Sequence, residues 1–166
     1  MRATRTGMDE LSEHQSRLGR LVIKAQGFES IVSIVLAHSL AVSLEVGSLL
    51  AGHMGLTGTI DAINKLSEQP DCRLDGQGAK AWVILAREAT AARNRAIHQP
   101  WAAVAENSEH TVGLNARLDR RRSKFTRADP SELDETTELL DRAMVAGADL
   151  AGILVDVATM GRAAPS

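Results

Sequence analysis

Apolar residues in the first third of the chain recur every three or four positions, the spacing that places side chains on one face of an α-helix. Charged residues of this stretch mostly fall between them. The apolar positions are Leu18, Leu21, Val22, Ala25, Phe28, Val32, Val35, Leu36, Val42, Val46 and Leu49. The pattern predicts one long amphipathic helix from about Asp9, or two helices broken near Gly27. A turn at Gly52-His53-Met54-Gly55 is expected to end it.

Two further helices are predicted in the middle of the chain. Thr59 can cap a short helix, which Pro70 closes. A third helix runs from about Ala79 to His98 and buries Trp82. It ends there because the residue before Pro100 avoids the helical region of backbone space.

The start of the last helix is marked by Asp129-Pro130-Ser131-Glu132, which combines an Asp cap, a proline at the first helical position and a carboxylate. Leu133, Leu140 and Gly147 recur by sevens in this helix, which we expect to reach about Met160. Between the third and last helices, residues 112–118 alternate apolar and polar positions. They predict a strand or a hairpin turning near Asp119-Arg120.

The composition favours helices over a β-sandwich, because only 2% of the 166 residues are aromatic and the core must be aliphatic. A chain of this length is ordinarily one domain. We therefore predict an all-α, up-and-down bundle of four or five helices, with a small β-hairpin between the third and last helices. The domain is expected to span residues 9–160, with flexible tails at 1–8 and 161–166.

Charge and cysteine content narrow the function classes. The net charge of -2 excludes a globally basic nucleic-acid coat, so any polyanion must bind a local patch. Cys72 is the only cysteine, which rules out an intrachain disulfide and makes a Cys-based zinc site implausible. The apolar run Ser30–Leu44 is shorter than the roughly 20 residues of a membrane span. No secretory signal is visible, so we expect a cytoplasmic protein without cofactor or metal, not bound to a membrane.

The clearest chemistry lies in Arg93-Asn94-Arg95-Ala96-Ile97-His98, at the end of the third predicted helix. At 100° per residue Asn94 and His98 share a face, whereas Arg93 lies about 140° from His98 and converges on it only where the helix end loosens. His98 could exchange a proton with a ribose hydroxyl. Arg93 could hold a phosphate, which Asn94 could help to orient. Together these groups would cleave RNA without a metal.

The simpler interpretation is structural: Arg93 and Arg95 are solvated helix charges, and His98 finishes the helix near its C-terminal dipole. The other histidines carry no comparable pattern. His14 is expected at the surface and His38 in the core.

The arginine, the polar residue after it and the histidine resemble the Arg-x4-6-His signature of the HEPN superfamily, in which the residue after the arginine is often Asn. The resemblance covers the motif and, loosely, the helix order. It implies a helical bundle, usually a homodimer, in which two motifs face each other across a cleft and act as a metal-independent endoribonuclease. Carried over by position, Arg93, Asn94 and His98 would be the active residues. A toxin or defence role, with an antitoxin or other protein partner, would fit.

A second feature is the basic segment 117–127, which carries six cations and one anion. Beside His98 it could follow an RNA backbone. The residues expected to contact RNA are Arg95, Arg117, Arg120, Arg121, Arg122 and Lys124. In the alternative, these arginines lie in a solvated turn and pair with Glu132, Asp134, Glu135 and Glu138.

The leading hypothesis is thus a dimeric, HEPN-like RNA-binding protein that cuts RNA. The alternative is a non-catalytic helical interaction or dimerisation module that binds a protein partner. Exposure of His98 beside Arg93 favours catalysis, and burial of both favours the module. A small-molecule-binding bundle would need a closed apolar pocket among the helices.

Overall fold

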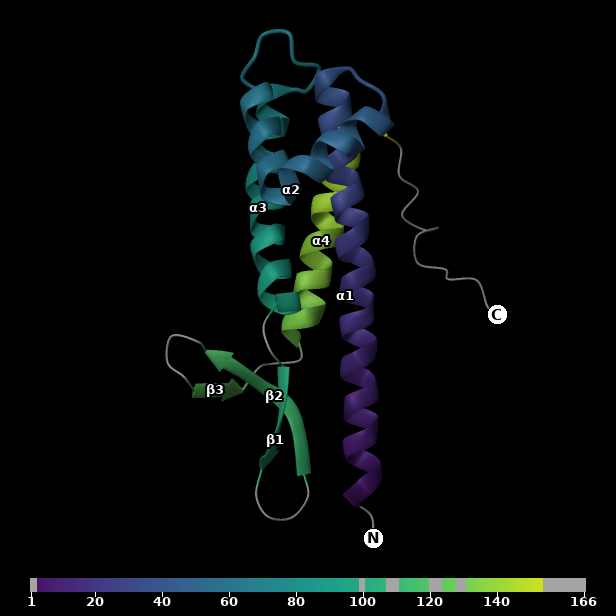
Figure 1. Cartoon of the computed structure of the whole chain (residues 1–166), viewed down its shortest axis with the longest axis vertical. Coiled ribbons are helices and arrows are strands. Elements are labelled where there is room, and N and C mark those ends of the chain that lie inside the picture. Colours follow the sequence, from purple (N-terminus) through teal and green to yellow (C-terminus); the bar gives the residue numbers. More distant parts are fainter. Residues whose placement is uncertain (1–2, 99–100, 107–110, 120–123, 128–130, 154–166) are drawn as a thin grey trace, which may run out of the picture. The chain divides into compact units, whose positions relative to one another are not determined.

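The computed structural model describes residues 3–98, 101–106, 111–119, 124–127 and 131–153, with side chains described for 12–98 and 131–153. Four helices and three strands lie in these residues (Figure 1). In chain order they are α1 (Ala3–Leu40), α2 (Leu44–Leu66), α3 (Gly76–His98), β1 (Trp101–Glu106), β2 (Thr111–Asp119), β3 (Lys124–Arg127) and α4 (Ser131–Leu150). The predicted helical bundle is confirmed.

Contacts divide the chain into two compact units. Unit 1 comprises Met1–Ala25 and Ala91–Glu138, and unit 2 comprises Gln26–Thr90 and Leu139–Ser166. Helices α1, α3 and α4 each contribute residues to both units.

The core of unit 2 is aliphatic around one phenylalanine and one tryptophan. Its largest fully buried side chains are Phe28, Leu36, Ile60, Ile63, Leu140, Val32, Val35 and Val83. The Trp82 indole N–H donates to the Ala143 carbonyl at 3.0 Å. Beside it, a Cβ on Gly147 would lie only 2.7 Å from Cγ2 of Ile31. Residues of α1, α3 and α4 therefore meet around a position that has no side chain.

Helix α1 ends well before the predicted glycine turn. Ala41 adopts a left-handed conformation (φ 57°), its amide donates to the His38 carbonyl, and the Val42 amide donates to the Ala37 carbonyl. These bonds form a Schellman motif. Ser43 then caps α2 by accepting from the Val46 amide. The predicted continuous helix through Gly52 is therefore wrong.

The turn changes which side of the chain faces the core. Gly47 packs so closely against α1 that an added Cβ would lie 2.5 Å from the Ala37 Cβ. Val42, Val46 and Leu49, predicted as part of the buried stripe, are exposed instead. Their three- and four-residue spacing continues across the turn, but the buried face of α2 is set by Gly47.

Gly55 interrupts α2 with a left-handed, non-helical conformation (φ 68°, ψ 168°). The predicted turn at this glycine is thus a kink inside one helix. Thr59 does not cap a new helix as predicted, because its buried hydroxyl donates back to the Gly55 carbonyl at 2.8 Å. This bond satisfies one backbone acceptor next to the kink.

Replacing Ala41 with glycine is expected to raise the free energy of unfolding by about 0.5–1 kcal/mol. A left-handed conformation costs a non-glycine residue roughly 1–2 kcal/mol, and glycine removes this cost. Part of the gain is lost because glycine also makes the unfolded chain more flexible. Urea denaturation measures the change as a higher midpoint at constant slope.

The matched control is Gly152→Ala, because Gly152 (φ 67°) occupies the same place in the motif that ends α4. An added Cβ there meets nothing within 4 Å, so only backbone strain changes. We expect this variant to be less stable by a similar amount. A stabilised Gly152→Ala would contradict the explanation for both positions.

Helix α4 begins at Ser131, one residue after the proline predicted at the first helical position, and ends at Leu150, not near Met160. Its Leu133, Leu140 and Gly147 are buried, as their spacing predicts. The motif closed by Gly152 ends the helix early because the left-handed residue turns the chain away from the helix axis.

The strands between α3 and α4 form an antiparallel sheet in the order β1-β2-β3. Trp101 pairs with Arg117 across β1 and β2, and Asp119 pairs with Lys124 across β2 and β3. The predicted turn at Asp119-Arg120 falls at the end of β2, and residues 120–123 lie outside the described residues. At the N-terminus α1 begins at Ala3, so most of the predicted loose tail 1–8 is helical. The predicted tail 161–166 lies outside the described residues.

One helical stretch among the described residues, Ser12–Leu40, is long and apolar enough to cross a membrane by length and composition. Core helices of soluble proteins pass the same test, and many apolar side chains of this stretch are buried, including Leu21, Phe28 and Val35. The stretch is weak evidence for a membrane span.

Candidate functional site

The Arg93–His98 motif occupies the last turns of α3, within unit 1. The helix is held by small side chains on its inner face, because Ala92 and Ala96 are buried. Arg93, next to this face, is half-buried, whereas Asn94, Arg95 and His98 are exposed. The spacing of the alanines therefore sets which motif residues reach solvent.

Arg93 and Asn94 form a direct side-chain contact. The Nη1 group of Arg93 donates a hydrogen bond to Oδ1 of Asn94 at 3.0 Å. The bond fixes one edge of a planar guanidinium whose forked donors match the geometry of a phosphate. The sequence predicts that Asn94 helps to orient a phosphate, and in the structure the oxygen of its side-chain amide orients the arginine.

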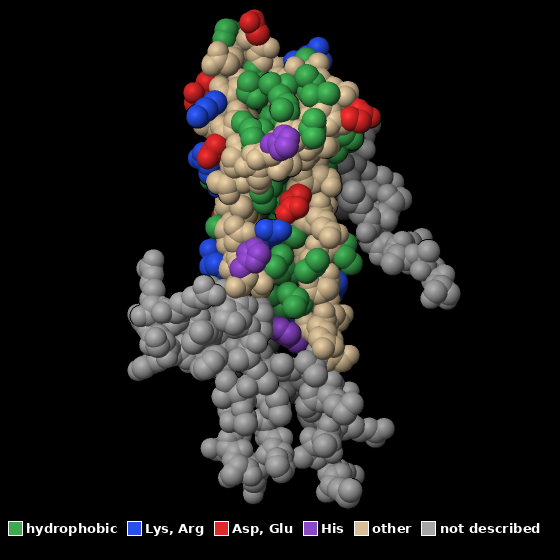
Figure 2. Space-filling model, in the orientation of Figure 1, with side chains coloured by type: hydrophobic (Ala, Val, Ile, Leu, Met, Phe, Trp, Pro, Cys, Tyr) green, Lys and Arg blue, Asp and Glu red, His purple; other side chains and the backbone are tan. Residues whose placement is uncertain are grey.

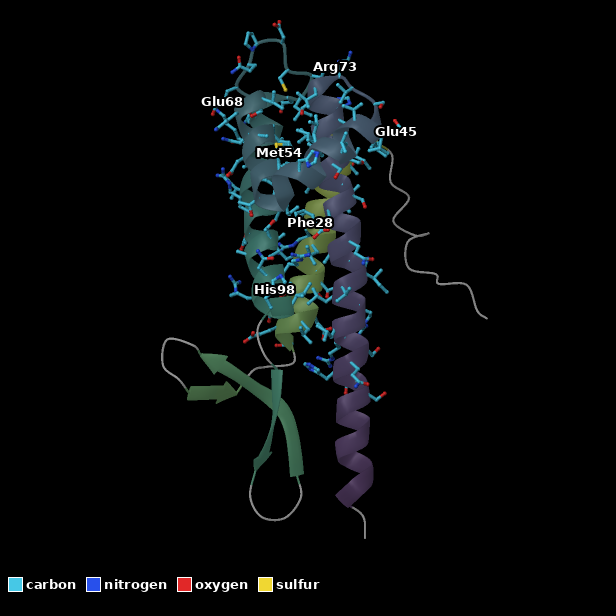
Figure 3. All side chains as sticks on the ribbon, in the orientation of Figure 1. Phe28, Glu45, Met54, Glu68, Arg73 and His98 are labelled. Carbon is cyan, nitrogen blue, oxygen red and sulfur yellow. The ribbon has the colours of Figure 1, made fainter. Side chains whose placement is uncertain are left out.

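His98 is the final residue of α3 and its imidazole is exposed (Figure 3). A group that exchanges protons with a large polymer must be accessible to it. Exposure of His98 beside Arg93 would favour catalysis, and burial of both would favour an interaction module. In the structure His98 is exposed and Arg93 is half-buried. The helix end before Pro100 is where the two side chains would have to converge.

A charged cluster joins α1 and α4 in the same unit. Arg17 binds the Asp134 carboxylate at 2.9 Å and that of Glu13 at 2.7 Å. Arg20 lies 3.9 Å from Asp134. Asp134, one of the acids predicted to pair with the basic segment, is thus engaged by arginines of α1.

His14 lies near this cluster in sequence and is buried, not at the surface as predicted. Burial lowers the pKa of His14 below its ordinary value, and the positive charge of Arg17 lowers it further. The folded protein therefore favours the neutral imidazole.

Stability is expected to fall as the pH drops through the ordinary histidine pKa of about 6.5. Below that value the unfolded chain binds a proton that the folded chain resists, so acidification favours unfolding; above it both states are neutral and the contribution is constant. Urea midpoints measured between pH 7.5 and pH 5.5 test this. His14→Gln should flatten the slope. An unchanged slope in His14→Gln would contradict the assignment.

The basic segment is described only in part. Arg117 lies on β2 and Lys124 on β3, where the backbone alone is described, and Arg120, Arg121 and Arg122 lie outside the described residues. The register pairs Arg117 with Thr126 and Asp119 with Lys124. Both cations therefore lie on neighbouring strands of one sheet.

In the part of the chain that the structure describes, no group of three or more His, Cys, Asp or Glu side chains could hold a metal ion. The single cysteine, Cys72, is half-buried and free. Comparisons with family models, curated proteins and solved structures give no significant match to this chain. The functional argument therefore rests on the chain's own residues.

Proposed function

We propose that this chain is a cytoplasmic, HEPN-like RNA-binding protein that cleaves RNA without a metal ion. The observation that carries the proposal is the end of α3, where a half-buried Arg93 oriented by Asn94 precedes an exposed His98. The helical bundle is compatible with the family that the motif resembles. The proposal includes a homodimer with a toxin or defence role and an antitoxin or other protein partner.

The chemistry assigned to these residues is transfer of a phosphodiester within the RNA. The 2′-oxygen attacks the adjacent phosphorus as its proton leaves, and the bond from phosphorus to the 5′-oxygen breaks. His98 exchanges one of the two protons, either taking it from the 2′-hydroxyl or giving it to the leaving 5′-oxygen, and water exchanges the other. Arg93 stabilises the charge that grows on the phosphate oxygens. The products are a 2′,3′-cyclic phosphate and a 5′-hydroxyl.

Binding of RNA is assigned to phosphate contacts. The chain has few aromatic residues to stack on bases, so cations must supply affinity. Arg95 is exposed one turn before His98, and the basic segment 117–127 is the main concentration of positive charge in the sequence. Such binding weakens steeply with salt.

The test is incubation of the purified chain with a mixed RNA pool in excess EDTA. We expect fragments that carry 2′,3′-cyclic phosphate and 5′-hydroxyl ends. Absence of cleavage over a wide range of protein concentration, with RNA binding retained, would contradict the catalytic part of the proposal. It would favour the alternative of a non-catalytic RNA-binding or interaction module.

That alternative has one specific observation in its favour. The first half of α2 exposes several large apolar side chains, among them Leu44, Val46 and Leu49. Exposed apolar groups of this kind commonly mark protein interaction sites. A ribonuclease can also carry such a surface, so the two functions are compatible.

A further inference from the structure

The first half of α2 presents an apolar face to solvent. Leu49 is 64% exposed, the largest value in this helix among the exposed hydrophobic residues. Leu44, Val46, Leu50 and Met54 are between 37% and 51% exposed. Figure 2 shows hydrophobic side chains gathered on this part of the surface, and Figure 3 labels Glu45 and Met54 on α2. We call residues 44–54 the α2 face.

The orientation of this face follows from the packing of α2 on α1. Gly47 is buried against Ala37, where no side chain could be added. Leu49 lies two residues further, about 200° around the helix, and so points away from α1. Leu49 is thus exposed because Gly47, on the opposite side of α2, packs against α1.

Charge restricts what can cover the α2 face. Residues 41–60 contain no Lys or Arg, and Glu45 is their only charged residue apart from the titratable His53. A surface without cations does not attract nucleic acid or an anionic membrane. Hydrogen bonding with Ser43 and with its own backbone amide lowers the pKa of Glu45, which keeps the carboxylate ionised. The chemistry fits an apolar protein surface that offers a partner for one carboxylate.

The sequence of the α2 face is complementary to itself when reversed. Glu45 and His53 each lie four residues from Leu49, on either side. Val46 and Gly52 each lie three residues away, and an added Cβ on Gly52 would meet nothing within 4 Å. In an antiparallel pair centred on Leu49, Glu45 would lie level with His53 of the other helix. Val46 would lie level with Gly52, where no side chain obstructs it.

We infer that the α2 face binds the α2 face of a second copy of this chain, antiparallel, with Leu49 on the two-fold axis. The two Leu49 side chains cover each other, and Val46, about 60° from Leu49 around the helix, flanks them. An imidazole N–H of His53 donates to the Glu45 carboxylate of the other copy, in either protonation state of the histidine. This is the isologous arrangement that a two-fold dimer requires. The inference assigns the contact of the proposed homodimer to the α2 face and not to the motif at the end of α3, and it does not depend on the ribonuclease chemistry.

The first test is sedimentation equilibrium of the full chain, whose mass is 17.8 kDa. We expect Leu49→Asp to halve the assembled mass and to raise the dissociation constant at least about 30-fold, as for a central interface residue. Ile84→Asp is the matched control, because Ile84 is 68% exposed on α3 and lies outside the α2 face. It should assemble as the wild type does. A monomeric wild type at about 100 μM, well above typical dimer dissociation constants, or an unchanged assembly in Leu49→Asp would overturn the inference.

The second test swaps the charges across the axis. Glu45→Lys alone should weaken assembly, and Glu45→Lys combined with His53→Glu should restore it, because the pair is re-formed with opposite polarity. The two residues are about 12 Å apart along one helix, so a rescue cannot arise within one copy. A double variant that assembles less well than Glu45→Lys would contradict the antiparallel register. Circular dichroism confirms that each variant is helical.

Discussion

His98→Ala is expected to lower the rate of RNA cleavage in EDTA by at least about 100-fold, the range in which a positioned proton-transfer group contributes. The reason is chemical, because His98 is exposed at the end of α3 and its removal takes away a proton-transfer group without opening a cavity. The thermal unfolding midpoint should therefore stay where it is in the wild type. The measurement is the initial rate on a defined RNA that the wild type cuts.

His98→Gln separates proton transfer from hydrogen bonding at the same position. Glutamine can donate and accept hydrogen bonds but does not titrate in this range, so its cleavage rate should be as low as that of His98→Ala. Activity in His98→Gln with none in His98→Ala would make His98 a hydrogen-bonding group instead. Unchanged cleavage by both variants would refute the mechanism, since the active group would lie elsewhere or in a contaminating nuclease.

Gly147→Ala is expected to lower the free energy of unfolding by about 1–2 kcal/mol. The new Cβ would lie 2.7 Å from Cγ2 of Ile31 and 2.8 Å from Nε1 of Trp82. The indole cannot move aside without losing its 3.0 Å hydrogen bond to the Ala143 carbonyl. Overpacking costs about 1–3 kcal/mol, which exceeds the gain of up to about 1 kcal/mol from alanine's higher helix propensity. Urea denaturation monitored by tryptophan fluorescence measures the difference.

Gly19→Ala is the matched control for this prediction. Gly19 also lies inside a helix, but an added Cβ would meet nothing within 4 Å. The propensity gain is then unopposed, and the variant should be more stable than the wild type by up to about 1 kcal/mol. If both variants shift stability in the same direction, the packing explanation for Gly147 fails.

The sequence predicts helix ends well where a residue type forbids or favours one backbone conformation. Pro100 places the end of α3, and Asp129-Pro130-Ser131 places the start of α4. The same residues locate the motif at a helix terminus, and the buried Ala92 and Ala96 follow from helical periodicity. Exposure of His98 could thus have been anticipated from its phase relative to these alanines.

The turn after α1 could not be predicted from periodicity because its left-handed residue is an alanine. Ala41 carries no sequence signal for this conformation, and the apolar spacing continues through Val42 and Val46. Ser43 was the available indication, since serine is a common helix cap. The burial of His14 likewise has no signal in the sequence, because both of its neighbours, Glu13 and Gln15, are polar.

The order in which the chain contributes to its two units limits how they can be studied in isolation. Unit 1 takes two separate stretches of sequence and unit 2 takes two others, in alternation. No single truncation yields either unit intact: a fragment ending at Ala25 lacks residues 91–138, and one ending at Thr90 lacks residues 139–166. A recombinant unit 1 would need Ala25 joined to Ala91 by a designed linker. Without such a redesign, either unit can be studied only in the whole chain.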